Sequence, residues 1–266
     1  MPLLMLTPRY SDDSINLRRA ALASGWQVER LLRWSIPEGL EPSEVVIYGE
    51  PLFCEFASQK LGLAILEPTF DWPATLPFAH VKRKIAYTTL REAREYPEKV
   101  FAKPAEEKCF PPKVYTSGKA IPHLVGISDE STVLLSEPVT MQVEFRCFVL
   151  EREVVTISPY IRDGKLAQNE AGHWVASEEE YRQAADFAKS VLEDPEVKIP
   201  AGVVMDVGLT KEHGWVVVEA NAAWSSGLCG CEPELVLSVL RRACFPKSEL
   251  SEGDGQWLVQ RVDRNV

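Results

Sequence analysis

The chain has 266 residues, which is enough for one composite domain or two. With 45% hydrophobic and 26% charged residues it has the composition of a soluble globular protein, and no apolar run is long enough to span a membrane. A net charge of −10 and the lack of a long basic run argue against nucleic acid as the main partner. Residues 1–7 lack the basic flank and length of a signal peptide, and the six scattered cysteines form no CxxC pair. We therefore expect reduced thiols and a cytoplasmic protein.

The first 66 residues alternate between short apolar segments and helical patterns. Ser11 to Ser14 is a strong helix start, and Gly25 is a stop signal for that helix. Alternation of this kind predicts a small parallel α/β unit, followed by a proline-rich linker over 68–77. The predicted strands are 2–7, 26–30, 45–48 and 63–66, and the predicted helices are 11–25 and 52–61.

The next segment begins with the basic run 80–84, which we expect to lead into a helix over 85–96 that ends at Pro97. Residues 100–104 then read as a short strand with Lys103 at its end, because the following proline cannot continue a ladder. Residues 133–139 form a further apolar strand that stops at an acid and a proline.

Residues 141–150 alternate strictly, with Glu144, Arg146 and Phe148 on one face and apolar side chains on the other. We expect this strand to pair with 154–159 across a tight turn. Later elements are a helix with a Ser177–Glu180 capping box, a helix opened by Pro233, and a polar tail with a possible short strand at 257–262.

Residues 201–227 predict a hairpin whose loop lies at 211–214. In the expected register Leu209 faces Val216, Asp206 faces Glu219, and Val204 faces Asn221. One face is then wholly apolar, including Val218, while the other collects Asp206, Glu219 and Asn221. Two carboxylates and an amide oxygen are ligands that Mg²⁺ prefers, although a solvated outer face with two accidental acids is the alternative.

The order of these motifs resembles the ATP-grasp family, in a divergent branch of the carboxylate–amine ligase type. The matching pieces are F-A-K-P at 101–104, L-L-S-E-P-V at 134–139, E-F-R at 144–146, and Asp206 followed by V-E-A-N at 218–221. The resemblance implies an ATP-grasp fold, α/β and α+β in class, with an N-terminal parallel α/β domain. It implies the divisions 1–78 (N-terminal domain), 79–134 (lobe with the phosphate lysines), 135–246 (lobe with hinge and metal hairpin) and 247–266 (tail).

The resemblance also assigns roles to particular residues, with ATP and two Mg²⁺ ions as the expected cofactors. Asp206, Glu219 and Asn221 would hold the metal, and Arg146 or Arg162 would reach the transferred phosphoryl group, although Arg162 could equally form a surface ion pair. The nucleotide would contact two phosphate lysines, the hinge, an acid on the ribose hydroxyls, and a lysine of the lid: Lys84, Lys103, Ser136, Glu137, Val139, Glu144 and Lys113.

Three features depart from the family pattern or stay open. Residues 105–113 contain no glycine for a phosphate-covering loop, so Lys108 or Lys113 would substitute. Val204 stands where many members carry an arginine, two positions before the metal aspartate. Ser225 and Ser226 could line an acceptor site or serve only as turn residues.

The function that the resemblance implies is an ADP-forming ligase that joins a carboxylate to an amine through an acyl-phosphate. Its substrates would be small molecules or peptides, with no nucleic-acid or membrane partner, and a homodimer is left open. The alternatives are an ATP-grasp phosphotransferase and a non-catalytic ATP-binding regulatory protein.

Overall fold

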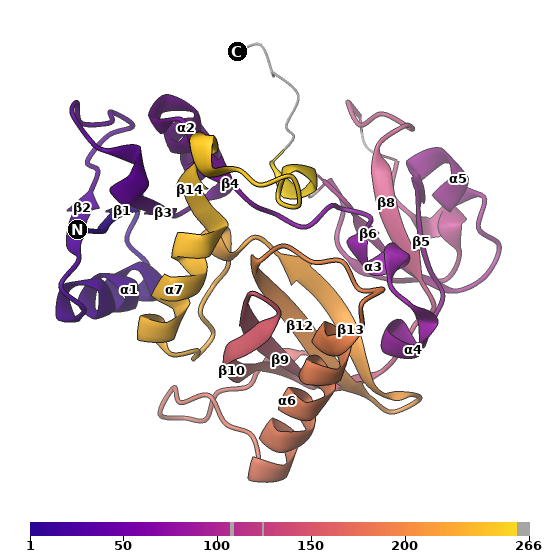
Figure 1. The fold of residues 1–266 in the computed structure, drawn as a ribbon. Coiled ribbons are helices and arrows are strands. Elements are labelled where there is room, and N and C mark those ends of the chain that lie inside the picture. The colour runs from indigo at the N-terminus through magenta and orange to yellow at the C-terminus, as the bar shows by residue number, and fades with distance from the viewer. Residues whose placement is uncertain (107–108, 124, 260–266) are drawn as a thin grey trace.

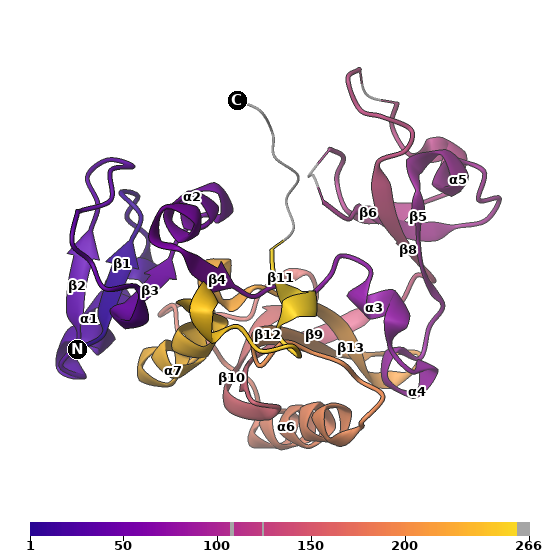
Figure 2. The ribbon, with the colours of Figure 1, turned by 45° about the horizontal axis from the view of Figure 1, so that its top comes forward.

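The computed structural model describes residues 1–106, 109–123 and 125–259 of the chain. Its main parts are a small parallel sheet, a four-stranded antiparallel sheet and a five-stranded antiparallel sheet. The small sheet and the four-stranded sheet lie on opposite sides of the five-stranded sheet, at the left and right of the ribbon (Figures 1 and 2). Within the described ranges, no helix has the length and apolar character that a membrane span requires.

The N-terminal unit is a parallel sheet in the order β2-β1-β3, as the alternation of strands and helices predicts. Helix α1 starts at a capping box in which Ser11 and Ser14 each accept the other's backbone N–H. The expected fourth strand does not join this sheet, because β4 pairs antiparallel with β14 and so ties the unit to the C-terminal part. The elements are β1 (Leu3–Leu6), α1 (Asp12–Ala23), β2 (Gln27–Arg30), β3 (Val45–Tyr48), α2 (Pro51–Leu61), β4 (Leu63–Ile65) and β14 (Cys244–Pro246).

The proline-rich passage after β4 is packed against the large lobe. Trp72 is 1% exposed, and its indole N–H donates to the Lys198 carbonyl at 2.6 Å. The two short helices here, α3 (Trp72–Thr75) and α4 (Phe78–Val81), both contact β13 (Gly214–Asn221). The passage thus connects two lobes while contributing to the core of one of them.

The four-stranded sheet has the order β5-β8-β6-β7. The single helix predicted over 85–96 is wrong in its first half, where the β-branched and aromatic run Ile85 to Thr89 pairs with β8. The helix begins only after Thr89, whose side chain accepts the Glu92 N–H as an N-cap. The elements are β5 (Ile85–Thr89), α5 (Leu90–Arg94), β6 (Val100–Pro104), β7 (Lys113–Tyr115) and β8 (Thr132–Ser136).

The five-stranded sheet has the order β11-β10-β9-β12-β13 and forms the floor of the molecule. Helix α6, which starts at the predicted Ser177–Glu180 capping box, packs on the apolar face of this sheet. The predicted tail strand over 257–262 is absent from its described part, where Leu258 makes only an isolated bridge to Leu66, and 260–262 lie outside the described residues. The elements are β9 (Met141–Leu150), β10 (Glu153–Arg162), β11 (Lys165–Leu166), α6 (Glu178–Glu193), β12 (Gly202–Thr210), β13 and α7 (Pro233–Ala243).

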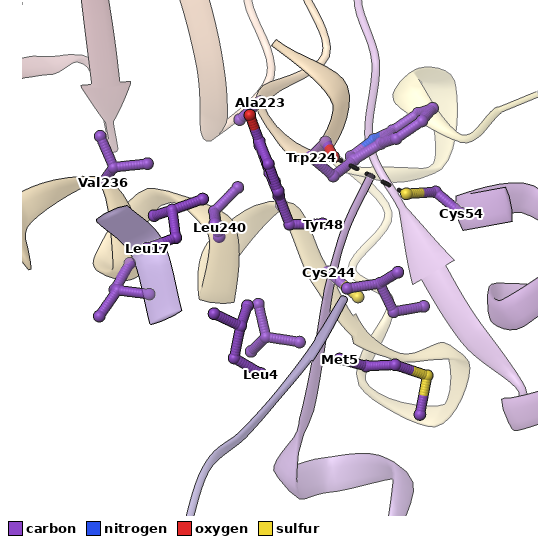
Figure 3. Packing of buried hydrophobic residues seen from close by; sticks show 14 of the residues in the cluster. Leu4, Met5, Leu17, Tyr48, Cys54, Ala223, Trp224, Val236, Leu240 and Cys244 are labelled. Atoms are coloured by element: carbon purple, nitrogen blue, oxygen red, sulfur yellow. Dashed lines mark hydrogen bonds between the residues drawn. The ribbon is translucent and has the colours of Figure 1, made fainter. Parts of the chain in front are cut away.

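A shared hydrophobic core joins the N-terminal unit to the large lobe (Figure 3). Leu4, Leu17 and Tyr48 of the N-terminal unit pack with Val236 and Leu240 of α7 and with Trp224, which follows the metal hairpin. The buried Cys54 thiol lies 3.7 Å from the Trp224 carbonyl oxygen. This core fixes the chain that follows β13 against the N-terminal unit, and so limits how far that chain can move relative to the hairpin.

Candidate active site

A cavity of about 330 Å³ lies between the four-stranded and the five-stranded sheets. Its walls combine apolar side chains with five charged ones, a mixture that suits a ligand with an apolar end and an anionic end. The described lining residues are Pro73, Arg83, Ile85, Phe101, Lys103, Pro112, Val114, Leu134, Ser136, Glu137, Val139, Met141, Glu144, Tyr160, Val218 and Glu219.

The predicted hinge residues Ser136, Glu137 and Val139 all line this cavity. Glu137 is fixed by two contacts with Lys84: its carboxylate accepts the Lys84 N–H at 2.9 Å, and its own N–H donates to the Lys84 carbonyl at 3.1 Å. The first strand of the smaller lobe is therefore pinned to the hinge. Lys84 contributes its main chain here, while its side chain is exposed.

The predicted hairpin register is correct at the acids and wrong beyond them. Asp206 faces Glu219 and Val204 faces Asn221, but Leu209 faces Trp215, because a β-bulge at Val218 shifts the pairing by one residue. Val217 takes the place on the apolar face that was expected for Val218. Val218 itself is turned into the cavity and forms part of its wall.

A second bulge has the same effect on strand β10. Pro159 faces Phe145 and Ile161 faces Glu144, so Tyr160 is the extra residue, and it also lines the cavity. Its hydroxyl donates to Glu144 Oε2 at 2.9 Å. Burial raises the pKa of Glu144, with Asp206 and Glu219 adding to this, and the hydrogen bond from Tyr160 opposes it.

Asp206, Glu219 and Asn221 are brought together on the cavity side of the sheet. The Asn221 amide donates to Glu219 Oε1 at 3.0 Å and lies 3.5 Å from Asp206 Oδ2, so it joins the two carboxylates. Among the described residues no group of three or more His, Cys, Asp and Glu could hold a metal, so two acids and an amide are the protein's whole donor set here. These hard oxygens fit Mg²⁺ if phosphate oxygens and water complete the coordination.

Arg146 is the direct partner of Asp206 across the β9–β12 pair. Its Nε and Nη2 donate to the two carboxylate oxygens at 3.0 and 2.8 Å, and its Nη1 donates to the Gly227 carbonyl at 3.0 Å. Asp206 is fully buried; burial raises its pKa and the Arg146 guanidinium opposes this. A carboxylate has about four lone-pair sites, so a bidentate arginine leaves lone pairs on both oxygens for a cation.

Lys103 is the partner of Glu219, with Nζ 2.6 Å from Oε2. Burial acts to raise the pKa of Glu219, but the Lys103 ammonium and the Asn221 amide outweigh it and hold the pKa below its usual value. The pair lies at the border between the main cavity and a smaller recess of about 130 Å³, which Asn221 also lines. Lys103 is thus both a cavity wall and the counter-charge of an acid.

Other predicted residues are placed away from this cluster. Arg162 donates with both arms to Glu180 at 2.8 and 3.0 Å, which is the ion pair that the sequence left open for it. Lys113 is exposed on β7, with Nζ 5.1 Å from the centre of the Tyr115 ring, and Lys108 lies outside the described residues. The Ser226 hydroxyl donates to the Ala222 carbonyl at 2.7 Å, as a turn residue does.

Arg83 lines the cavity although the sequence pointed to its neighbour Lys84. It is 5% exposed, and its Nη1 donates to the Val81 and Val217 carbonyls at 3.0 and 2.9 Å. Burial lowers the pKa of Arg83 to about 10, so it remains charged at neutral pH. The signal available was the basic run itself, but the choice within that run depended on the direction of a strand that had been predicted as a helix.

The geometry therefore combines an apolar cavity, a hinge, opposed acids and basic side chains between two lobes. A family model described as an ATP-grasp domain, the second family of its clade, matches residues 80–239, which is more than half of the chain. The chain belongs to this ATP-grasp family.

Solved structures agree in fold. An ATP-grasp RimK domain protein from Sphaerobacter thermophilus DSM 20745 matches with a TM-score of 0.51 and 15% identity, over 91% of this chain and 98% of that one. D-alanine–D-alanine ligase from Bacillus anthracis matches with a TM-score of 0.51 and 9% identity, over 91% and 97%. No curated protein matches the chain. The predicted ATP-grasp fold, mixed α/β and α+β, is confirmed.

Proposed function

We propose that this protein is an ATP- and Mg²⁺-dependent ligase that joins a carboxylate to an amine, releases ADP and proceeds through an acyl-phosphate. The observation that carries the proposal is the pairing of Asp206 with Glu219 at one end of the cavity, with Lys103 bonded to Glu219. Opposed like charges are unfavourable across a sheet unless cations lie close to them. Lys103 supplies one such cation, and a metal bound to a triphosphate would supply the other.

The nucleotide would extend from the hinge to this pair. Phe101, Leu134 and Met141 offer apolar contact to a base near the Glu137 hinge, and Glu144 would accept hydrogen bonds from the ribose hydroxyls. Lys103 would contact the phosphates as a mobile charge. We keep Lys84, Lys113 and Arg162 as weaker candidates, because their side chains are exposed or paired elsewhere.

Asp206, Glu219 and Asn221 would hold Mg²⁺, two ions being expected, and bound metal would neutralise charge on the transferring phosphoryl group. Arg146 would hold Asp206 in place and present its guanidinium to the phosphoryl end of the substrate. The adjoining recess, which shares Lys103 and Glu219 with the cavity, offers room for a second reactant beside the phosphates. Holding both reactants there would favour the two-step reaction.

The test is an ADP-release screen over pools of amino acids and small peptides with Mg²⁺, followed by mass spectrometry of the products. An amide product formed together with ADP is the expected result. A stable phosphorylated product would replace the proposal with a phosphotransferase. Thermal stabilisation by ATP and Mg²⁺, with no ADP release from any pool, would favour a regulatory nucleotide-binding protein.

A further inference from the structure

One aromatic side chain touches both of the charged groups on β9 that face the cavity. Glu144 and Arg146 lie two residues apart on the same face of this strand, and neither is in the other's hydrogen-bonding contacts among the described residues. Tyr160 joins them: its hydroxyl donates to Glu144 Oε2 at 2.9 Å, and the Arg146 Cζ lies 4.8 Å from the centre of its ring. The contact with Arg146 is a cation–π interaction.

The position of Tyr160 depends on the bulge in β10. In a regular ladder the residue opposite Glu144 would follow directly from the pair Ser158–Arg146, but the bulge places Ile161 there instead. Tyr160 is therefore free of a cross-strand partner and lines the cavity. Bulges re-aim single side chains in this way, often beside a binding site.

We infer that Tyr160 is a positioning residue that sets the ribose-binding carboxylate of Glu144 and the phosphate-facing guanidinium of Arg146 relative to each other. This inference rests on the proposed nucleotide site. The hydroxyl acts at the ribose end by fixing one oxygen of Glu144, so that the other oxygen faces the sugar. The ring acts at the phosphate end by supporting one face of the planar Arg146 guanidinium.

The two contacts can be separated by two substitutions. Tyr160→Phe removes the hydroxyl and keeps the ring, whereas Tyr160→Leu removes both. The ligands are ATP, 2′,3′-dideoxy-ATP, which lacks both ribose hydroxyls, and adenosine, each titrated with Mg²⁺ by calorimetry. Tyr181→Phe is the matched control, since its hydroxyl interacts with Ser158 and its ring packs on Phe145.

We expect Tyr160→Phe to weaken ATP binding by about tenfold, the usual effect of losing a hydrogen bond to a charged group, and to leave dideoxy-ATP unchanged. Tyr160→Leu should add a further loss of several-fold for ATP that is not seen with adenosine. Tyr181→Phe should retain the full preference for ATP over dideoxy-ATP. In a Glu144→Gln background, Tyr160→Phe should have no additional effect on that preference, because the residue acts through Glu144.

Two results would overturn the inference: an unchanged preference for ATP over dideoxy-ATP in Tyr160→Phe, or an extra loss in Tyr160→Leu that is equal for ATP and adenosine. Both are readable in a folded Tyr160→Phe or Tyr160→Leu protein, which circular dichroism and Tm establish beforehand. If the unaltered protein fails to bind ATP at all, the proposed function fails instead, and the two failures are thereby distinguished.

Discussion

Arg146 holds both carboxylate oxygens of Asp206, at 3.0 and 2.8 Å, across neighbouring strands of the large sheet. The arginine side chain is 12% exposed and the aspartate is fully buried, so each charge depends on the other for compensation. Many relatives carry an arginine two residues before the metal aspartate, where this chain has Val204. Here an arginine reaches the same aspartate from the adjacent strand, which gives the aspartate a cationic partner by a different route.

Removal of Arg146 should therefore affect the fold as well as the site. We expect Arg146→Met to lower the free energy of unfolding at neutral pH by about 3–5 kcal/mol, because a buried carboxylate is left without its partner. Chemical denaturation measures this value. The double variant Arg146→Met/Asp206→Asn should recover part of the loss. A single variant as stable as the unaltered protein would contradict the structural pairing.

Glu219 offers a cleaner test of the metal assignment than Asp206, since its side chain is 28% exposed and pairs with a lysine that can turn to solvent. Glu219→Gln should change the free energy of unfolding by only about 1 kcal/mol. The extra rise in Tm that Mg²⁺ adds to ATP should disappear in this variant. Glu153→Gln, an exposed carboxylate at the start of β10, is the control. A Mg²⁺-dependent rise retained in Glu219→Gln would remove Glu219 from the metal site.

The ion pair between Arg162 and Glu180 predicts a pH dependence of stability. The hydrogen bonds from Arg162 hold the pKa of Glu180 at about 2, below its ordinary 4.5. Because the folded-state pKa is depressed, the contribution is complete above pH 4.5 and is lost as the pH falls toward 2. After allowance for partial exposure, the contribution is about 2 kcal/mol.

Glu180→Gln keeps a side chain that can complete the capping box and loses only the charge. We expect it to be about 2 kcal/mol less stable than the unaltered protein at pH 7, with the two stabilities converging near pH 2. Denaturation curves across the acid range up to neutral pH provide the measurement. A constant difference across this range would show that the charge of Glu180 contributes nothing to folding.

Gly208 controls the shape of the cavity floor. A Cβ at this position would come 3.0 Å from both Met141 Sδ and Val218 Cγ2, which are the ends of two side chains that line the cavity. Gly208→Ala should cost about 1 kcal/mol of stability while narrowing the cavity, and so weaken ATP binding several-fold. Gly255→Ala, where a Cβ has open space, is the control. ATP affinity and Tm together test this expectation, and unaltered affinity would show that the floor can yield.

Errors in the predicted elements had a common cause. The segment 85–96 has the spacing of a helix, but its first half pairs with β8 once that strand is present, and pairing with a partner outweighs local propensity. The fourth predicted strand exists but joins β14, which lies far along the chain. In both cases the segment was identified, while its partner belonged to a distant part of the sequence.

Alternation along a single strand placed Glu144 with Arg146, and hairpin symmetry placed Asp206 opposite Glu219. These relationships follow from the two-residue period of a strand and from one local turn, so the sequence by itself determined them. The partnership of Arg146 with Asp206, the choice of Arg83 over Lys84, and the turning of Tyr160 and Val218 into the cavity required the tertiary structure. Each of these depends on which strands become neighbours and on where a bulge interrupts their pairing, and no local period encodes either.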